Sequence, residues 1–258
     1  MCSIVILRRP GSEWPVILGA NRDEMLNRPW TPPGRLWSDR PQVTAGLDLL
    51  AGGTWMGIND DGVVAAILNR MNSLGPLPGA RSRGELVLEA LDHAEAWSAA
   101  SALGEIDAAA YRSFNMVVID DRAGFWLRNL GAEEGARQIE IMPLPSGLSM
   151  ITAHDRNDMA SPRISAYLPR FEAAEAPRPA GPPKGGYWRA WERLLADSEP
   201  PPGEGPGAAM TIGEANGFGT VSSSLLALPA AGRQLKPVWR FAPGPPDRAA
   251  YRRVRLSA

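Results

Sequence analysis

The chain has 258 residues, a formal net charge of −1, 44% hydrophobic and 21% charged residues, and one cysteine. This balance is ordinary for a globular protein with a substantial core, and it gives no electrostatic basis for binding nucleic acid or an anionic membrane. A single cysteine excludes an intramolecular disulfide, and no apolar run reaches the roughly 20 residues that span a bilayer. We therefore expect no stable membrane insertion and, because no secretory signal precedes the first apolar run, a cytoplasmic location.

Two apolar segments open the chain. Residues 3–7 are rich in β-branched side chains and predict a buried strand, and residues 14–20 predict a second strand. Pro10-Gly11-Ser12 lies between them and predicts a turn, so the two segments are expected to form an opening β-hairpin. Asn21-Arg22-Asp23-Glu24 comes directly after the second strand. Residues 27–42 contain four prolines and predict a loop.

The middle of the chain predicts a hairpin followed by a helix. The Asp-Gly pair at positions 61 and 62 is a strong turn signal, and residues 63–68 predict a strand that ends at Asn69. Residues 83–97 carry an apolar stripe opposite a charged face, which predicts one amphipathic helix.

The second half of the chain predicts more strands than helices. The expected strands are residues 114–120, 125–130, 138–142, 148–152, 218–228 and 237–241, and the expected helices are residues 161–174 and 187–196. Two segments rich in proline and glycine, near 175–186 and 197–208, predict surface loops, because the stretch of chain after each is too short to fold alone. We therefore expect residues 1–258 to form one domain of antiparallel sheets covered by helices.

Cys2 is the residue that suggests chemistry. If Met1 is removed, Cys2 carries both a thiol and a free α-amine, and such an amine titrates near neutral pH and serves as a base for its own nucleophile. The hairpin would return Arg22 and Asp23 to Cys2, where Arg22 would favour the thiolate and Asp23 would hold the amine. The alternatives are a small buried hydrophobe at position 2 and a solvated charge cluster in a turn.

The chain resembles the NRDE family, also called the transport-and-Golgi-organisation family. The matching motifs are Met1-Cys2, Asn21-Arg22-Asp23-Glu24, Gly52-Gly53-Thr54-Trp55-Met56-Gly57, Leu68-Asn69-Arg70, Phe114-Asn115 and Gly219-Thr220 with Ser222-Ser223. The resemblance implies an α+β fold, a four-layer αββα sandwich of the N-terminal-nucleophile (Ntn) hydrolase type. It also implies a likeness to the penicillin V and bile salt amidases. By that likeness the catalytic residues of this chain would be Cys2, Arg22, Asp23 and Asn69, with Asn69 as the oxyanion donor.

Two positions depart from the amidase pattern. Ala153 stands where the amidases carry a second asparagine, and Val221 stands where the family pattern carries an arginine. Both changes remove polar groups from the expected site. The resemblance therefore predicts a degenerate hydrolase site.

Three further residues are candidates for ligand binding. Asn21 and Trp55 belong to the family motifs, and His154 lies in a polar loop where it would serve as an acid/base group or an axial haem ligand. The alternative for His154 is a loop histidine bonded to Asp155 or Asp158. One cysteine and two distant histidines give no zinc pattern, so no metal and no required cofactor are expected.

Three functions are compatible with these observations. The favoured hypothesis, implied by the resemblance, is haem binding and trafficking, with haem as a small-molecule ligand held at a degenerate site. The alternative is a cysteine amidohydrolase or acyltransferase that acts on an amide or thioester bond. The third is a scaffolding role, which assigns no function to Cys2 and Arg22.

Overall fold

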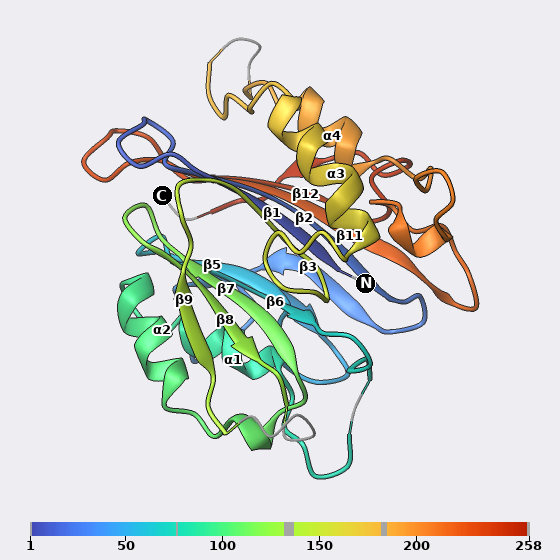
Figure 1. Cartoon of the computed structure of the whole chain (residues 1–258). Helices are drawn as coiled ribbons and strands as arrows, with labels where there is room; N and C mark the ends of the chain where they lie inside the picture. Colours follow the sequence, from blue (N-terminus) through green and yellow to red (C-terminus); the bar gives the residue numbers. More distant parts are fainter. Residues whose placement is uncertain (1, 76, 132–136, 182–184, 257–258) are drawn as a thin grey trace. The chain divides into compact units, whose positions relative to one another are not determined.

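The computed structural model describes residues 2–75, 77–131, 137–181 and 185–256. The chain divides into two compact units, unit 1 (Met1–Asn27 and Pro145–Leu256) and unit 2 (Arg28–Leu144). Each unit contains one antiparallel sheet with helices packed on it (Figure 1). That both units form one domain stays a prediction.

Unit 1 contains a six-stranded sheet in the order β10-β1-β2-β11-β12-β13. Its strands are β1 (Ser3–Arg8), β2 (Val16–Met25), β10 (Gly147–Ile151), β11 (Phe218–Leu228), β12 (Val238–Ala242) and β13 (Arg252–Arg253). The predicted hairpin is confirmed, since β1 pairs with β2 from Ser3 opposite Asn21 to Arg8 opposite Val16.

The placement of the Asn21–Glu24 segment differs from the prediction. This segment lies inside β2, not after it, because β11 pairs with β2 along its whole length, from Phe218 opposite Met25 to Leu228 opposite Val16. Backbone pairing with a long neighbour thus keeps four polar residues in a strand. The consequence is that their side chains alternate between the two faces of the sheet.

Two helices cover one face of this sheet, α3 (Pro162–Ala173) and α4 (Arg189–Leu195) (Figure 1). Ser161 caps α3, because its side-chain oxygen accepts from the backbone N–H of Ile164. Pro169 lies inside this helix without ending it, since Leu168 and Phe171 on either side of it are buried in the core with Trp191 of α4. Tertiary packing therefore outweighs the local effect of the proline.

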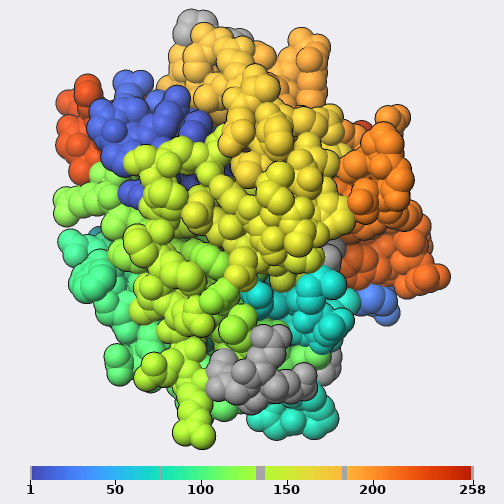
Figure 2. All heavy atoms as spheres, viewed as in Figure 1, coloured from blue at the N-terminus to red at the C-terminus, as the bar shows by residue number. Residues whose placement is uncertain are grey.

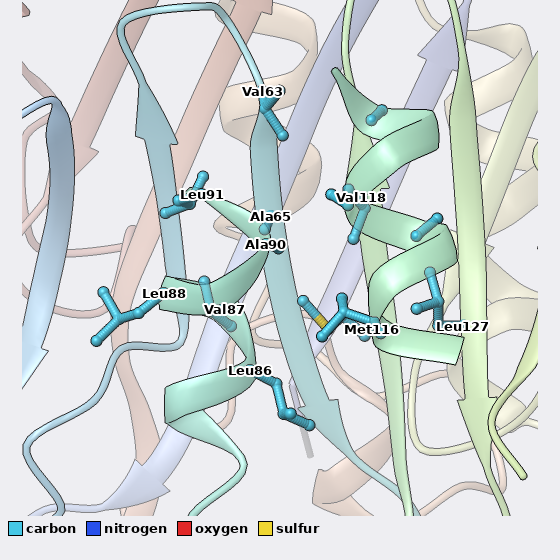
Figure 3. Close-up of a cluster of buried hydrophobic side chains, with 14 of the residues drawn as sticks. Val63, Ala65, Leu86, Val87, Leu88, Ala90, Leu91, Met116, Val118 and Leu127 are labelled. Atoms are coloured by element: carbon cyan, nitrogen blue, oxygen red, sulfur yellow. The ribbon is translucent and has the colours of Figure 1, made fainter. Parts of the chain in front are cut away.

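Unit 2 contains a seven-stranded sheet in the order β3-β4-β5-β6-β7-β8-β9. Its strands are β3 (Trp30–Gly34), β4 (Val43–Asp48), β5 (Met56–Asn59), β6 (Val64–Asn69), β7 (Phe114–Ile119), β8 (Gly124–Asn129) and β9 (Glu140–Pro143). Its helices are α1 (Gly84–Ala90), α2 (Ala96–Gly104) and the short 3-10 helix η1 (Ala108–Ala110). Figure 3 shows apolar side chains of α1, such as Leu86 and Ala90, in one buried cluster with Ala65 of β6 and Met116 of β7.

The single helix predicted over residues 83–97 is wrong, because the chain forms α1 and then α2. The side-chain amide of Asn59 donates to the carbonyl groups of Leu91 and His93, which takes these carbonyls out of a continuing helix. The carboxylate of Asp120 accepts from the backbone N–H of Ala96 and so starts α2. Both partners come from distant parts of the sequence, and the amphipathic pattern alone does not show them.

The predicted loops also contain regular structure. β3 lies within residues 27–42, and the 3-10 helix η3 (Pro206–Ala208) ends the segment 197–208. Part of the predicted loop 175–186, residues 182–184, lies outside the described residues. In the described part of the chain, no helix combines the length and apolar character needed to cross a membrane.

Gly53 of the Gly52–Gly57 motif is expected to tolerate no side chain. A Cβ at this position would lie 2.5 Å from the carbonyl carbon of Gly84, where α1 begins, and backbone cannot move aside as a side chain can. We expect Gly53→Ala to lower the free energy of unfolding by about 1–3 kcal/mol, measured by urea denaturation. Gly213→Ala is the control, because nothing lies within 4 Å of its added Cβ. Equal losses for both variants would contradict the close approach.

Candidate active site

Cys2 lies just before β1, and its thiol is held by the neighbouring strand. Sγ donates to the backbone carbonyl of Asp23 and accepts from the backbone N–H of Asp23, both at 3.4 Å. The side chain of Cys2 is half-buried. Because β1 and β2 pair with Ser3 opposite Asn21, alternation places Cys2 and Arg22 on the same face of the sheet. The structure therefore brings together Cys2, Arg22 and Asp23.

The thiol of Cys2 is a weak acid in this environment. Burial raises its pKa above the ordinary value of a cysteine, and the Asp23 carboxylate raises it further. The N-terminal ammonium, the Asp23 backbone N–H and the Arg22 guanidinium lower this pKa, but they do not outweigh the other two effects. Arg22 thus acts in the predicted direction, toward the thiolate, but burial and Asp23 outweigh it, so a base is needed to activate the thiol at neutral pH.

The reactivity of Cys2 is expected to reflect this raised pKa. In the chain that keeps Met1, alkylation by iodoacetamide should be slow at neutral pH and should still be increasing above the ordinary pKa of a cysteine thiol, because only the thiolate reacts. Intact mass spectrometry of timed samples measures this rate without ambiguity, since Cys2 is the only cysteine. A rate that levels off below pH about 8 would contradict the raised pKa.

Asp23 points to the opposite face of the sheet, beneath the helices. Its carboxylate accepts from Nη1 of Arg163 at 3.0 Å and from Oγ1 of Thr220 at 2.6 Å. The side chains of Asp23 and Arg163 are 0% and 4% exposed. The sequence predicts the α-amine of Cys2 as the partner of Asp23, and the structure adds a buried ion pair that the sequence reasoning missed.

Arg163 gave one signal in the sequence that could have revealed it. It is the second residue of α3, directly after Ser161-Pro162, and a cation in the first turn of a helix is opposed by the helix dipole. Such a residue needs a specific anionic partner when it is buried. Nothing in the sequence identifies that partner as Asp23, which is 140 positions away.

Asn21 joins β2 to the helical layer. Its amide nitrogen donates to the carbonyl groups of Leu195 and Met210, both at 2.9 Å, and its oxygen accepts from Oγ of Ser223 at 2.6 Å. Ser223 also lies 2.6 Å from the hydroxyl of Tyr251. Asn21 thus links β2 to the helical layer close to Cys2, and its contact with a ligand stays a prediction.

The Asn21–Glu24 motif and the Gly219–Ser223 motif are partners across two strands. Thr220 lies opposite Asp23, Ser222 opposite Arg22, and Ser223 opposite Asn21. The partners Asp23 and Asn21 are two positions apart, whereas Thr220 and Ser223 are three apart. A β-bulge at Val221 absorbs the extra residue, so both hydroxyls reach the helix-covered face.

The remaining predicted residues lie elsewhere. Asn69 is the last residue of β6, opposite Phe114, and Trp55 packs edge-on against Trp30 with ring centroids 5.7 Å apart; both belong to unit 2. His154 is half-buried in unit 1 after β10, and its backbone N–H donates to Oγ1 of Thr152. The catalytic role of Asn69 and the ligand contacts of Trp55 and His154 stay predictions.

No metal centre is evident in the part of the chain that the structure describes. There, no three side chains of the types His, Cys, Asp and Glu gather in a group that could hold a metal ion. The chemistry available around Cys2 is that of a thiol, a guanidinium and a buried carboxylate.

Solved structures share this fold at low sequence identity. An orthologue of N-acylethanolamine-hydrolyzing acid amidase from Caenorhabditis elegans has a TM-score of 0.57 and 12% identity, over 87% of this chain and 92% of that one. A mutant conjugated bile acid hydrolase from Clostridium perfringens has a TM-score of 0.55 and 10% identity, over 100% of this chain and 94% of that one. The chain therefore has the α+β fold of the Ntn hydrolases, as predicted.

The family is established by the sequence. Residues 1–158, more than half of the chain, match the family Transport and Golgi organisation 2, and the chain belongs to it. A homologue from Bos taurus is 36% identical over 116 residues, which cover 41% of this chain and 38% of that protein. A homologue from Mus musculus is 43% identical over 75 residues, which cover 28% of this chain and 26% of that protein. The chain thus spans less than half the length of either curated relative.

Proposed function

We propose that this protein uses Cys2 as a nucleophile on the carbonyl carbon of an amide or thioester. The observation that supports the proposal best is the position of the thiol. Cys2 is half-buried, its Sγ is fixed by both backbone groups of Asp23, and its side chain shares a face of the sheet with Arg22. A fixed thiol on a partly exposed residue beside a cation is typical of a catalytic cysteine and unusual for a structural one.

In this proposal Met1 is removed and the α-amine of Cys2 is the base. The amine takes the thiol proton while sulfur bonds to the carbonyl carbon, and the bond from this carbon to the leaving nitrogen or sulfur then breaks. The proton passes from the amine to the leaving group. Water, deprotonated by the same amine, then attacks the acyl-enzyme, releases the acid and restores the thiol. The raised thiol pKa makes such a base necessary.

The experiment compares two forms of the protein. One is the processed chain, whose loss of Met1 is checked by intact mass, and the other carries a short N-terminal extension that blocks the amine. Both are incubated with an N-acyl amide and an acyl thioester, and adducts on Cys2 are measured by mass spectrometry. We expect acylation of the processed chain alone. No adduct on Cys2 in either form would refute the nucleophile, and equal adducts would refute the amine base.

Haem binding is the second candidate, and the two departures from the amidase pattern favour it. Ala153 comes after β10 and is buried, and Val221 is buried at the bulge opposite β2, so both replace polar groups by apolar ones near Cys2. Lower polarity suits a carried ligand better than hydrolysis. A titration of haem followed by absorbance tests this function, with His154→Ala to identify an axial ligand. No saturable spectral shift at micromolar protein would refute it.

A further inference from the structure

The buried pair of Arg163 and Asp23 connects the helical layer to the nucleophile. Arg163 bonds the Asp23 carboxylate at 3.0 Å and, through its other nitrogen, the carbonyl of Gly207 at 2.9 Å. Asp23 in turn holds Sγ of Cys2 with its backbone N–H and carbonyl. The segment around α3 is on the surface of unit 1 (yellow in Figure 2), yet Arg163 itself is buried. One arginine thus fixes the residue on which the thiol rests.

We propose that Arg163 is a positioning residue for Cys2, which anchors the Asp23 carboxylate on the helix-covered face and balances its charge. The purpose of this arrangement rests on the proposed function, in which the thiol must lose its proton. Without Arg163, the carboxylate would lose both its anchor and its counter-charge. The negative charge of the carboxylate would then act more strongly on the thiol, and the thiolate would become harder to form.

Few other charges lie around the thiol in the described part of unit 1. Asp23 and Arg22 come from β2, and Arg22 is itself 3.7 Å from Glu24. The strands β10 and β11 contain only uncharged residues. His154, Asp155 and Arg156 come after β10, and Arg156 donates to Oγ of Ser149 in that strand. The N-terminal ammonium also acts on the thiol.

The test measures the thiol itself and needs no substrate. The full chain is treated with iodoacetamide between about pH 6 and 10, and the alkylation rate of Cys2, the only cysteine, is followed by intact mass. The variants are Arg163→Gln, Arg163→Lys, Asp23→Asn and the double variant Asp23→Asn/Arg163→Gln. The control is Arg170→Gln, which removes a half-exposed arginine of the same helix that pairs with Asp197. Circular dichroism at each pH confirms that every compared variant is folded.

The proposal predicts a result for each of the four variants and for the control. Arg163→Gln shifts the pH profile of the alkylation rate to higher pH, so the rate at pH 8 falls about three- to tenfold. Asp23→Asn shifts the profile to lower pH. The double variant has the same profile as Asp23→Asn, because Arg163 acts through Asp23. Arg163→Lys stays near the wild type, since it keeps the charge. Arg170→Gln leaves the profile unchanged, because Arg170 pairs with Asp197 and not with Asp23.

Two results would overturn the proposal. One is a folded Arg163→Gln protein whose profile equals that of the wild type or is shifted to lower pH. The other is a double variant that differs from Asp23→Asn as much as Arg163→Gln differs from the wild type. If Arg163→Gln does not fold, Asp23→Asn and Arg163→Lys decide, and a wild-type profile for Asp23→Asn refutes the role. Because iodoacetamide replaces the substrate, failure of the proposed acyl transfer leaves this result intact.

Discussion

Replacing Cys2 by alanine is expected to lower the rate of acyl-amide or thioester cleavage by at least about a thousandfold. The reason is that alanine removes both the attacking sulfur and the covalent intermediate, while the paired strands around position 2 are unchanged. The measurement is release of the amine or thiol product by the processed chain, with substrate in excess.

Cys2→Ser is the matched control, because it keeps a nucleophilic atom and the α-amine. We expect it to retain slow turnover above that of Cys2→Ala, and both variants to unfold at the wild-type temperature within a few degrees. Cleavage by Cys2→Ala at the wild-type rate would show that sulfur takes no part. Ligand binding would then remain as the proposed function, and the haem titration measures it directly.

Arg163→Met is expected to lower the free energy of unfolding by about 3–5 kcal/mol. Methionine fills much of the same space but cannot bond the Asp23 carboxylate, which is 0% exposed and would stay buried without its guanidinium partner. Thr220 still donates to Asp23, but a hydroxyl does not balance the charge. Urea denaturation near neutral pH measures the loss.

Arg170→Met provides the comparison within the same helix. Arg170 bonds Asp197 at 2.7 Å, but its side chain is 49% exposed, so solvent screens this pair. We expect a loss of at most about 1 kcal/mol for this variant. Similar losses at the two positions would mean that the buried pair contributes little beyond a surface ion pair. The double variant Asp23→Leu/Arg163→Met should recover part of the loss, because it leaves no buried charge.

The sequence predicted that Arg22 and Asp23 lie close to Cys2, because the contacts that bring them there are local. The turn between the first two strands and the pairing of those strands bring Arg22 and Asp23 to Cys2, and both can be predicted from the first 25 residues. The direction in which each side chain points was not predictable without β11. Its pairing extends β2 through Asn21–Glu24 and so sends Asp23 under the helices.

The residues that were missed depend on contacts between distant segments. Arg163 and Thr220 meet Asp23 from 140 and 197 positions away, and no periodicity in either segment indicates that meeting. The same reason explains the incorrect helix over residues 83–97. Its end depends on Asn59 and the start of the next helix on Asp120, each far from it in the sequence. Local patterns predicted the elements, but not the polar contacts that end them.

The bulge at Val221 makes the number of residues in β11 matter as much as their identity. A chain lacking this one residue could pair with β2 without interruption, and its backbone ladder would be more regular. Thr220 and Ser223 would then be two positions apart, like Asp23 and Asn21, so the hydroxyl of Thr220 would still face the Asp23 carboxylate. Losing one residue here is therefore compatible with the site, whereas gaining one without a wider bulge would turn Thr220 to the other face of the sheet.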